Sequence, residues 1–347
     1  MTKIDWERYP HIAHNPFTRS LLLLEASLGH APNTLDAYAR SREDFFAFCT
    51  VLKILPEEAT KEHVALWVRD LTSRPKQRCL RQTPDPRVGL ANATVQQRLT
   101  ALRLFFDFLI EKGQRDDNPI GRGRFTPHNG FYNQRDRTLL PRFHKLPWIP
   151  NDDQWRVVVQ AVREQPLRNR TMFSLAYDAA LRREEICSLQ ISDFDFAHRL
   201  LTVRAETTKN RQERMIPFSH ITGQLLATYL RHRRTVSTRS GPIFLSESRR
   251  NRTVPLSIWT WSKVVSQIAQ QAALPRFTTH TLRHLCLTDL ARSGWDLHEI
   301  AVFAGHRSLA TTKDYIHLSG RDLAAKFARG MAQIHEWRMA VLTEAER

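Results

Sequence analysis

The chain has 347 residues, 41% of them apolar, which is enough to fill more than one hydrophobic core and favours two domains. Lys and Arg number 52 against 35 Asp and Glu, and this excess of +17 favours a polyanionic partner, nucleic acid first, although it also fits a merely basic protein. The longest apolar runs, such as Leu21–Leu24, are far too short to span a bilayer.

The chain begins M-T-K-I-D-W-E-R-Y-P, which lacks the basic and then apolar pattern of a secretion signal. Its cysteines are scattered without a C-x-x-C pair, which indicates neither a zinc site nor a disulfide framework. They are Cys49, Cys79, Cys187 and Cys286. We therefore expect a soluble protein of a reducing compartment, the cytoplasm.

Between Thr34 and Leu109 the apolar residues recur at helical spacing, apart from an insert rich in Pro and Arg from about Ser73 to Gly89. This half is therefore predicted to be all helix. The first helix holds Leu35, Tyr38, Phe45, Phe46 and Phe48. The second, starting near Thr60, holds Val64, Trp67, Val68 and Leu71. The third begins at Asn92 or Thr94 and places on one stripe Val95, Leu99, Leu102, Phe106 and Leu109.

The opposite face of this third helix carries side chains that can donate to phosphates or to base edges in a major groove. They are Gln96, Gln97, Thr100 and Arg103. Amide and charged side chains are also what a water-facing helix surface carries, so a solvated face is the alternative interpretation.

From Asp117 to Pro150 the sequence changes to N-P-I-G-R-G-R, further arginines and L-P-W-I-P, in which Gly and Pro break any periodicity. We interpret this change as a connection between domains, with an N-terminal domain over residues 1–120, a linker over 121–147 and a C-terminal domain over 148–347. Asn151 is suited to cap a helix that holds Trp155, Val158 and Val162.

The C-terminal domain is predicted to be mixed rather than purely helical. Leu200–Arg204 and Arg214–Phe218 have the pattern of two short strands, joined by the polar hairpin tip E-T-T-K-N-R-Q-E with a lysine near its apex. The predicted fold class is therefore mainly α with a small antiparallel β-sheet.

His280 and Arg283 lie three residues apart in H-T-L-R-H, which places both on one face of a helix if Thr278 or Thr279 caps its start. The first-turn amides and the positive end of the helix dipole then suit an anion such as phosphate. An ordinary capped helix with a surface arginine is the alternative. A metal site at His280 and His284 is disfavoured, because the glutamate of H-E-x-x-H is absent and Arg283 would repel a cation.

Arg182 lies in A-A-L-R-R-E-E-I-C-S-L, three residues before Glu185. A glutamate beside an arginine can hold the guanidinium in the orientation that grips two non-bridging phosphate oxygens. Taken alone, the spacing predicts a surface ion pair worth about 0.3–0.5 kcal/mol on a helix. The neighbouring apolar residues are predicted to form a buried stripe of Leu181, Ile186 and Leu189.

Five short motifs follow one another in a fixed order: A-L-R-R-E-E, T-K-N-R-Q-E-R-M-I-P, H-T-L-R-H, A-G-H, and a tyrosine nine residues after that last histidine. In this order they resemble the tyrosine recombinase family of the phage-integrase type. In the first half, T-L-D-A-Y-A-R-S-R-E-D-F-F-A-F and T-V-Q-Q-R-L-T-A-L-R-L-F-F-D-F-L, followed by N-P, are similar to the family's helical, SAM-like core-binding domain. The resemblance covers nearly all of the chain apart from its first dozen or so residues, the arginine-rich insert and the tail. It implies a core-binding domain followed by an α+β catalytic domain.

Carried over residue by residue, the resemblance implies a catalytic set for this sequence. Its members are the paired arginines Arg182 and Arg283, the hairpin lysine Lys209, the histidines His280 and His306, the nucleophile Tyr315 and the acidic support Glu185. The sequence departs from the family pattern twice: Ala180 stands where glycine is usual, and Glu184 where a small residue is common. Alanine for glycine is mild unless that backbone needs a positive φ.

The residue types suit the chemistry that the resemblance implies. A phenol with a pKa of about 10 needs a proton acceptor, for which His280 has a suitable pKa range. Two arginines can stabilise the charge that develops on the phosphate, each worth about 2.7–4 kcal/mol in comparable sites, so no metal is required. Lys209 is the expected acid for the leaving 5′ oxygen, and His306 is expected to bind the phosphate or align the phenol. The implied 3′-phosphotyrosine conserves the bond energy, so neither ATP nor another cofactor is expected.

The resemblance implies a site-specific recombinase or integrase that acts on double-stranded DNA. Transposition is among the reactions that it implies, and accessory proteins are among the possible partners. The tail has an apolar stripe of Leu323, Phe327, Met331, Ile334 and Trp337. We expect this tail to dock on a neighbouring subunit of a homotetramer, away from any membrane and on the DNA of the nucleoid. Two alternatives stay open: a type IB topoisomerase-like enzyme that relaxes DNA, and a noncatalytic DNA-binding regulator with the same fold.

Overall fold

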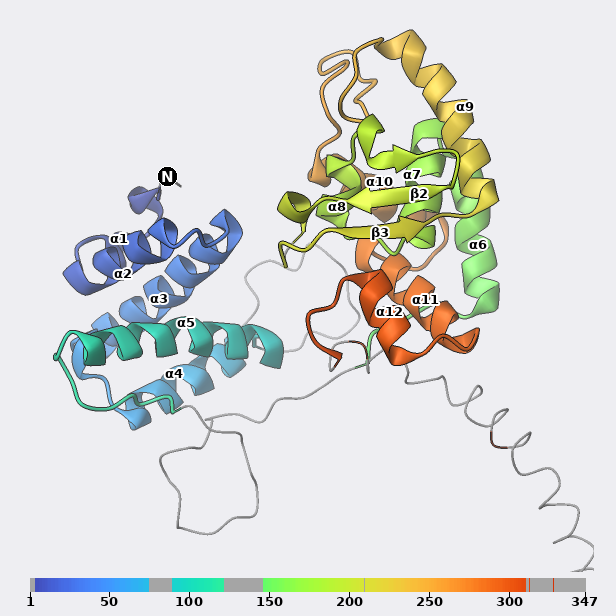
Figure 1. The fold of residues 1–347 in the computed structure, drawn as a ribbon. Helices are drawn as coiled ribbons and strands as arrows, with labels where there is room; N and C mark the ends of the chain where they lie inside the picture. Colours follow the sequence, from blue (N-terminus) through green and yellow to red (C-terminus); the bar gives the residue numbers. More distant parts are fainter. Residues whose placement is uncertain are drawn as a thin grey trace, which may run out of the picture. The chain divides into compact units, whose positions relative to one another are not determined.

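The structure, a computed structural model, describes residues 4–74, 89–121, 146–208, 210–309, 312 and 327. Lys209 and Tyr315 lie outside the described residues, as do most of the arginine-rich insert, the predicted linker and the tail. The chain divides into two compact units, Met1–Lys145 and Leu146–Arg347 (Figure 1). Among the described helices, none is both long and apolar enough to cross a membrane.

All regular elements in the described part of the first unit are helices. Its elements are η1 (Trp6–Arg8), α1 (Pro10–Ala13), α2 (Pro16–Ser27), α3 (Pro32–Leu52), η2 (Pro56–Glu58), α4 (Lys61–Ser73) and α5 (Asn92–Glu111). Proline occupies the first turn of α1, α2 and α3, where no intrahelical partner for its nitrogen is needed. The three helices predicted from apolar spacing are confirmed, with Thr60 as the N-cap of α4.

The core of the first unit forms where α3, α4 and α5 pack together. All five residues of the predicted α5 stripe are buried, from Val95 to Leu109. Phe45 of α3 contacts Trp67 and Phe106 edge to face, at ring-centroid distances of 5.2 and 6.1 Å. The periodic apolar residues therefore do form one continuous helical core.

The second unit is mixed, as predicted. Its helices are α6 (Asp152–Arg163), α7 (Leu167–Asp178), α8 (Arg183–Ser188), η4 (Ile191–Asp193), η5 (Ala205–Thr207), α9 (His220–Val236), α10 (Ile258–Gln271), α11 (Thr279–Arg292) and α12 (Leu297–Ala304). The N-caps expected at Asn151 and Thr278 are confirmed. The Asn151 side chain accepts from the backbone of Gln154, which satisfies an amide that the helix itself leaves unpaired.

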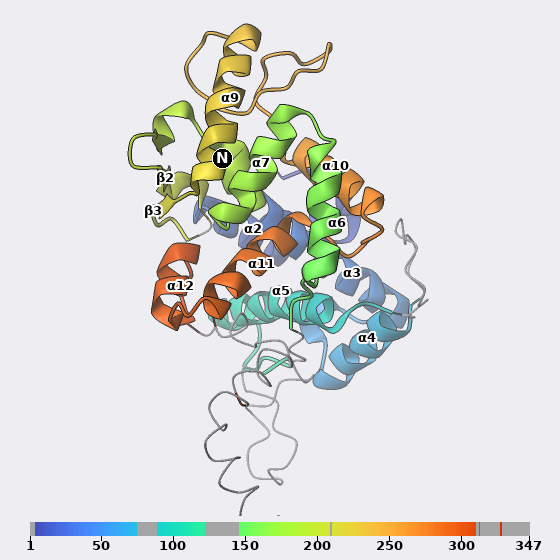
Figure 2. The ribbon, with the colours of Figure 1, turned by 90° about the vertical axis from the view of Figure 1, so that its right-hand side faces the viewer.

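The sheet is antiparallel, with strand order β1-β2-β3. It consists of β1 (Phe194–Asp195), β2 (Leu200–Val203) and β3 (Arg214–Pro217), and Leu201 of β2 lies opposite both Phe194 and Ile216. The two predicted strands are confirmed to within one residue, whereas the two-residue β1 was not predicted. Figure 2 shows α12 just below β3, with α11 beside α12 on the side away from the sheet, and α12 contacts both β3 and α11.

Candidate active site

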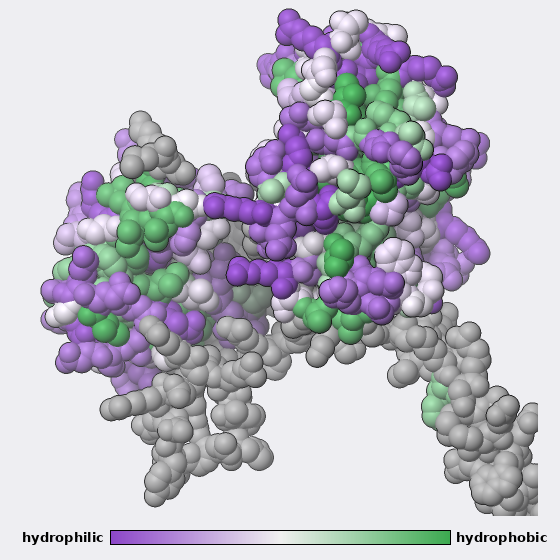
Figure 3. Space-filling view, viewed as in Figure 1, coloured by the Kyte–Doolittle hydropathy of each residue, from purple (hydrophilic) through white to green (hydrophobic). Residues whose placement is uncertain are grey.

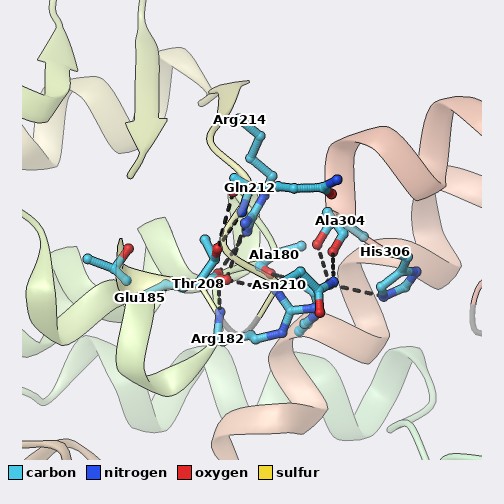
Figure 4. A network of polar contacts seen from close by, with 12 residues as sticks. Ala180, Arg182, Glu185, Thr208, Asn210, Gln212, Arg214, Ala304 and His306 are labelled. Atoms are coloured by element: carbon cyan, nitrogen blue, oxygen red, sulfur yellow. Dashed lines mark hydrogen bonds and ion pairs between the residues drawn. The ribbon is translucent and has the colours of Figure 1, made fainter. Parts of the chain in front are cut away.

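Arg182 and Glu185 form the first part of the site, and their pairing is not at the surface. Arg182 is the N-cap of the short helix α8, and its Nη1 donates to Glu185 Oε1 over 2.8 Å (Figure 4). The backbone amide of Arg182 donates to the other carboxylate oxygen over 2.9 Å. Glu185 is fully buried, so the prediction of a surface ion pair was wrong.

The reason for this burial is a second arginine, Arg214 of β3. Its Nη2 and Nη1 donate to the two oxygens of Glu185 over 2.7 and 3.2 Å. Burial alone would raise the pKa of Glu185, but the hydrogen bonds and charge of Arg214, followed by those of Arg182, lower it to about 2. Two guanidiniums therefore share one ionised carboxylate, and positive charge is left over on the side of Arg182.

Arg283 of α11 forms the second part of the site and is only 3% exposed. Its Nη1 donates to the carbonyl of Ala180 over 2.6 Å and its Nη2 to the carbonyl of Ala304 over 2.5 Å. Both acceptors are neutral, so these bonds fix the plane of the guanidinium without neutralising its charge. Ala180 lies two residues before Arg182, so this contact brings two separate sequence motifs together.

The backbone at Ala180 explains how its carbonyl reaches Arg283. Ala180 follows α7 and has a φ of +45°, in the left-handed region. A residue with a Cβ atom adopts this region at a cost of about 1–2 kcal/mol. The alanine is therefore not a mild departure from the family's glycine: it occupies a position that requires positive φ.

His306 lies against Arg283, directly after the left-handed C-cap residue Gly305. Its Nε2 is 3.0 Å from Nη2 of Arg283. Since arginine can only donate, Nε2 must accept, and Nδ1 then carries the proton and donates to the hydroxyl of buried Thr312 over 2.9 Å. Burial, reinforced by Arg283, Arg182 and Arg214, lowers the pKa of His306 to about 3, so its ring is neutral.

His280 occupies the first turn of α11 and remains exposed to solvent. Partial desolvation by the surrounding protein lowers the pKa of His280 from the usual 6.5. The charge of Glu184 opposes this lowering, and the charges of Arg283 and two neighbouring arginines add to it. Its ring lies 6.4 Å from that of His284. Within the described residues no group of three or more His, Cys, Asp or Glu side chains could hold a metal ion.

The hairpin tip is also tied to this region. Lys209 is outside the described residues, but its neighbour Asn210 donates from Nδ2 to the carbonyl of Gly305 over 3.1 Å. On the other side, the hydroxyl of Thr208 accepts from the backbone amide of Gln212 over 3.0 Å and closes the turn. One residue that flanks the lysine, Asn210, therefore contacts the A-G-H turn, whereas the other, Thr208, holds the hairpin tip together.

The predicted DNA-facing side chains of α5 belong to the first unit. Thr100 donates its hydroxyl to the carbonyl of Gln96 over 2.9 Å, and Nε of Arg103 donates to the carbonyl of Gly121 over 2.7 Å. Gln97 is exposed. At least two of the four side chains therefore have structural contacts of their own, and a DNA-binding role for this face stays a prediction.

Arg214 is the residue of this network that sequence reasoning missed. It lies in T-K-N-R-Q-E-R-M-I-P, two residues before the buried Ile216. Alternate residues of a strand share a face, so this arginine had to point inward with Ile216. An inward-facing arginine on a short strand predicts a buried acidic partner, and that signal was available.

The sequence model of the phage integrase family matches residues 151–321. Together with the fold, this defines the class of protein as a DNA breaking-and-rejoining enzyme. The chain is 31% identical over 242 residues to tyrosine recombinase XerC of Mycobacterium leprae, covering 67% of this chain and 74% of the relative. It is 27% identical over 319 residues to XerC of Thermodesulfovibrio yellowstonii, covering 88% and 92%. The chain belongs to the tyrosine recombinase family.

Solved structures agree with this fold. A Tn1549 transposon integrase in complex with a circular intermediate DNA matches with a TM-score of 0.64 and 16% identity, over 89% of this chain and 98% of the integrase. A XerH site-specific recombinase bound to a palindromic difH substrate matches with a TM-score of 0.63 and 20% identity, over 85% and 79%. At such identities the likeness shows the fold alone.

Proposed function

We propose that this protein is a site-specific recombinase that cleaves and rejoins duplex DNA through a 3′-phosphotyrosine on Tyr315, without metal or ATP. The observation that carries the proposal is the meeting of three separate motifs: Arg283 donates to Ala180 beside Arg182 and faces His306. Arg182 and Arg283, brought together in this way, are suited to bind the oxygens of a phosphate.

The arginines would bind the scissile phosphate. In this proposal Arg182 and Arg283 hold the non-bridging oxygens, and Glu185 orients Arg182. Because both guanidiniums are already held by hydrogen bonds, little reorganisation would be needed when charge develops in the transition state. Each arginine would contribute about 2.7–4 kcal/mol to transition-state stabilisation.

The proton transfers would use the remaining candidates. The phenolic oxygen of Tyr315 forms a bond to phosphorus while the bond to the 5′ oxygen breaks. His280 accepts the phenolic proton, since its lowered pKa keeps it neutral at neutral pH. Lys209 gives a proton to the 5′ oxygen. Rejoining reverses these steps on a different 5′ hydroxyl, so no external energy source is consumed.

Duplex DNA is the proposed substrate. The net charge of +17 supports it. On the face of the second unit seen in Figure 3, hydrophilic side chains are interspersed with apolar ones. The XerH and Tn1549 proteins with this fold have DNA bound. We propose that residues 1–120 are the core-binding domain, using the α5 face, and residues 148–347 the catalytic domain. The tail would join protomers into a homotetramer on the DNA of the nucleoid.

A nicked suicide substrate tests the chemistry. In the presence of chelator, the wild-type chain should become linked to the 3′ end of the cleaved strand, whereas Tyr315→Phe should form no adduct. Tyr177→Phe is the matched control: the Tyr177 hydroxyl donates to Asp289 over 2.7 Å, which commits this phenol to a structural bond. The control should still form the adduct.

Two outcomes would contradict the proposal. Cleavage that chelator abolishes and that leaves no adduct would favour a metal nuclease, and an adduct in Tyr315→Phe would place the nucleophile elsewhere. A plasmid assay separates the alternatives: exchange between two sites supports a recombinase, relaxation alone supports a topoisomerase, and DNA binding with neither supports a regulator.

A further inference from the structure

The C-terminal end of α12 is held by three side chains from three different parts of the second unit. The carbonyls of Phe303, Ala304 and Gly305 accept hydrogen bonds in succession. Their donors are Arg214 of β3, Arg283 of α11 and Asn210 of the hairpin tip, over 3.2, 2.5 and 3.1 Å. Figure 4 shows Arg214 and Asn210 beside Ala304. The last carbonyls of a helix carry partial negative charge, so cationic donors are well suited to them.

Arg214 is the donor that reaches both parts of the site. Its Nη1 and Nη2 bind Glu185, which in turn binds Arg182, and its Nε binds Phe303, three residues before His306. Each of its nitrogens has an acceptor, and the side chain is only 8% exposed. Arg214 is therefore not presented to a phosphate.

We propose that Arg214 is a positioning residue: it holds the guanidinium of Arg182 in its place relative to Arg283 and His306. This inference rests on the proposed function of the site. Glu185 can orient Arg182 only if its own carboxylate is fixed, and Arg214 fixes it from the opposite side. The same guanidinium donates to the carbonyl of Phe303 in the last turn of α12, and the next carbonyl of that turn accepts from Arg283. A lysine offers one nitrogen in place of three coplanar ones and cannot make this link.

Arg214→Lys is the first test, because it keeps a cation beside buried Glu185 while it removes the fork. The cleavage rate is measured in a single turnover at saturating enzyme, so that DNA affinity does not enter. A displaced Arg182 should slow adduct formation by about 10²-fold. Arg42→Lys is the matched control: Arg42 also binds a buried glutamate, Glu25, through two nitrogens, but in the first unit.

A second readout separates positioning from general loss of structure. A methylphosphonate at the scissile position replaces one charged oxygen with a methyl group, so less charge needs to be clamped. If Arg214 acts through Arg182, the ratio of wild-type to variant rates should fall on this substrate. Unchanged cleavage by Arg214→Lys, or an equal loss on both substrates, would overturn the inference. A wild-type chain that forms no adduct would instead overturn the proposed function.

Gly305→Ala tests the same contact if Arg214→Lys does not fold. A Cβ atom at Gly305 would lie 3.0 Å from Cδ and 3.1 Å from Nη1 of Arg214, so the Arg214 side chain would have to move by a few tenths of an ångström. Gly294→Ala is its control, since Gly294 also has a positive φ, +96° against +62°, but nothing lies within 4 Å of an added Cβ. We expect a cleavage defect in Gly305→Ala that exceeds that of Gly294→Ala; equal rates would contradict the inference.

Discussion

Each unit of the chain contains a buried glutamate that accepts from two nitrogens of one arginine, but the two networks differ in charge balance: the first pairs one cation with one anion, and the second places two arginines on one carboxylate. In the first unit, Arg42 of α3 donates to both oxygens of Glu25 of α2 over 2.9 and 2.6 Å, and neither side chain is more than 5% exposed. In the second unit, Glu185 forms ion pairs with both Arg182 and Arg214, and Arg283 lies nearby and donates to backbone carbonyls.

The difference separates a structural ion pair from a binding site. One cation with one anion is balanced, and Arg42 also donates from Nε to the carbonyl of Ala101, so the pair links α2, α3 and α5. Cations in excess of anions are unfavourable in a protein interior unless an external anion completes them. The burial and the geometry are similar in both units, so the charge balance carries the functional information.

The largest effect is expected from breaking the balanced pair. Arg42→Met leaves the buried carboxylate of Glu25 without its cation, which should cost the first unit about 3–5 kcal/mol in free energy of unfolding. The double variant Glu25→Leu with Arg42→Met removes both charges and should recover most of this loss. Native-state hydrogen exchange of the α3 and α5 amides in the full chain measures both. A double variant as unstable as the single one would show that the pair does more than balance charge.

A substitution in the arginine-rich network of the second unit should change the rate of cleavage rather than the free energy of unfolding. Arg182→Lys keeps the charge but loses the oriented fork, and we expect adduct formation to slow by about 10²–10³-fold. Arg183→Lys is an adjacent control, since Arg183 pairs with the partly exposed Glu184. Single-turnover cleavage of the suicide substrate compares the two. Equal rates in both variants would mean that Arg182 does not contact the phosphate.

Local sequence patterns predicted several of the elements, but not α1, α2, α7, α9 or α10 and not the network that joins the motifs. The helices α3, α4 and α5 each have one apolar stripe, and the caps at Asn151 and Thr278 precede such stripes, so periodicity was sufficient. The strand β1 was missed because two residues are too few to show any alternation.

The burial of Glu185 depends on a partner 29 residues away, and the contact between Arg283 and Ala180 spans 103 residues. Spacing along a helix gives no information at that range, which is why the spacing of Arg182 and Glu185, taken alone, predicted only a surface ion pair. The resemblance to a family named the residues that meet in the site. The resemblance did not explain how these residues are held together in space. The positive φ of Ala180 and the carbonyls at the end of α12 provide that explanation.

A smaller effect is expected in the pH dependence of cleavage, because desolvation, reinforced by the nearby arginines, lowers the pKa of His280. Its pKa is lowered from 6.5, so the ring stays neutral as the pH falls to that value and becomes protonated only below it. The second-order rate of cleavage at subsaturating enzyme, which reports on the free protein, should therefore lose activity below pH 6.5. Glu184 opposes the lowering, so Glu184→Gln should move this acid limb to still lower pH. His280→Gln should be slow and lack the limb, and an unchanged limb in that variant would assign the proton acceptor to another group.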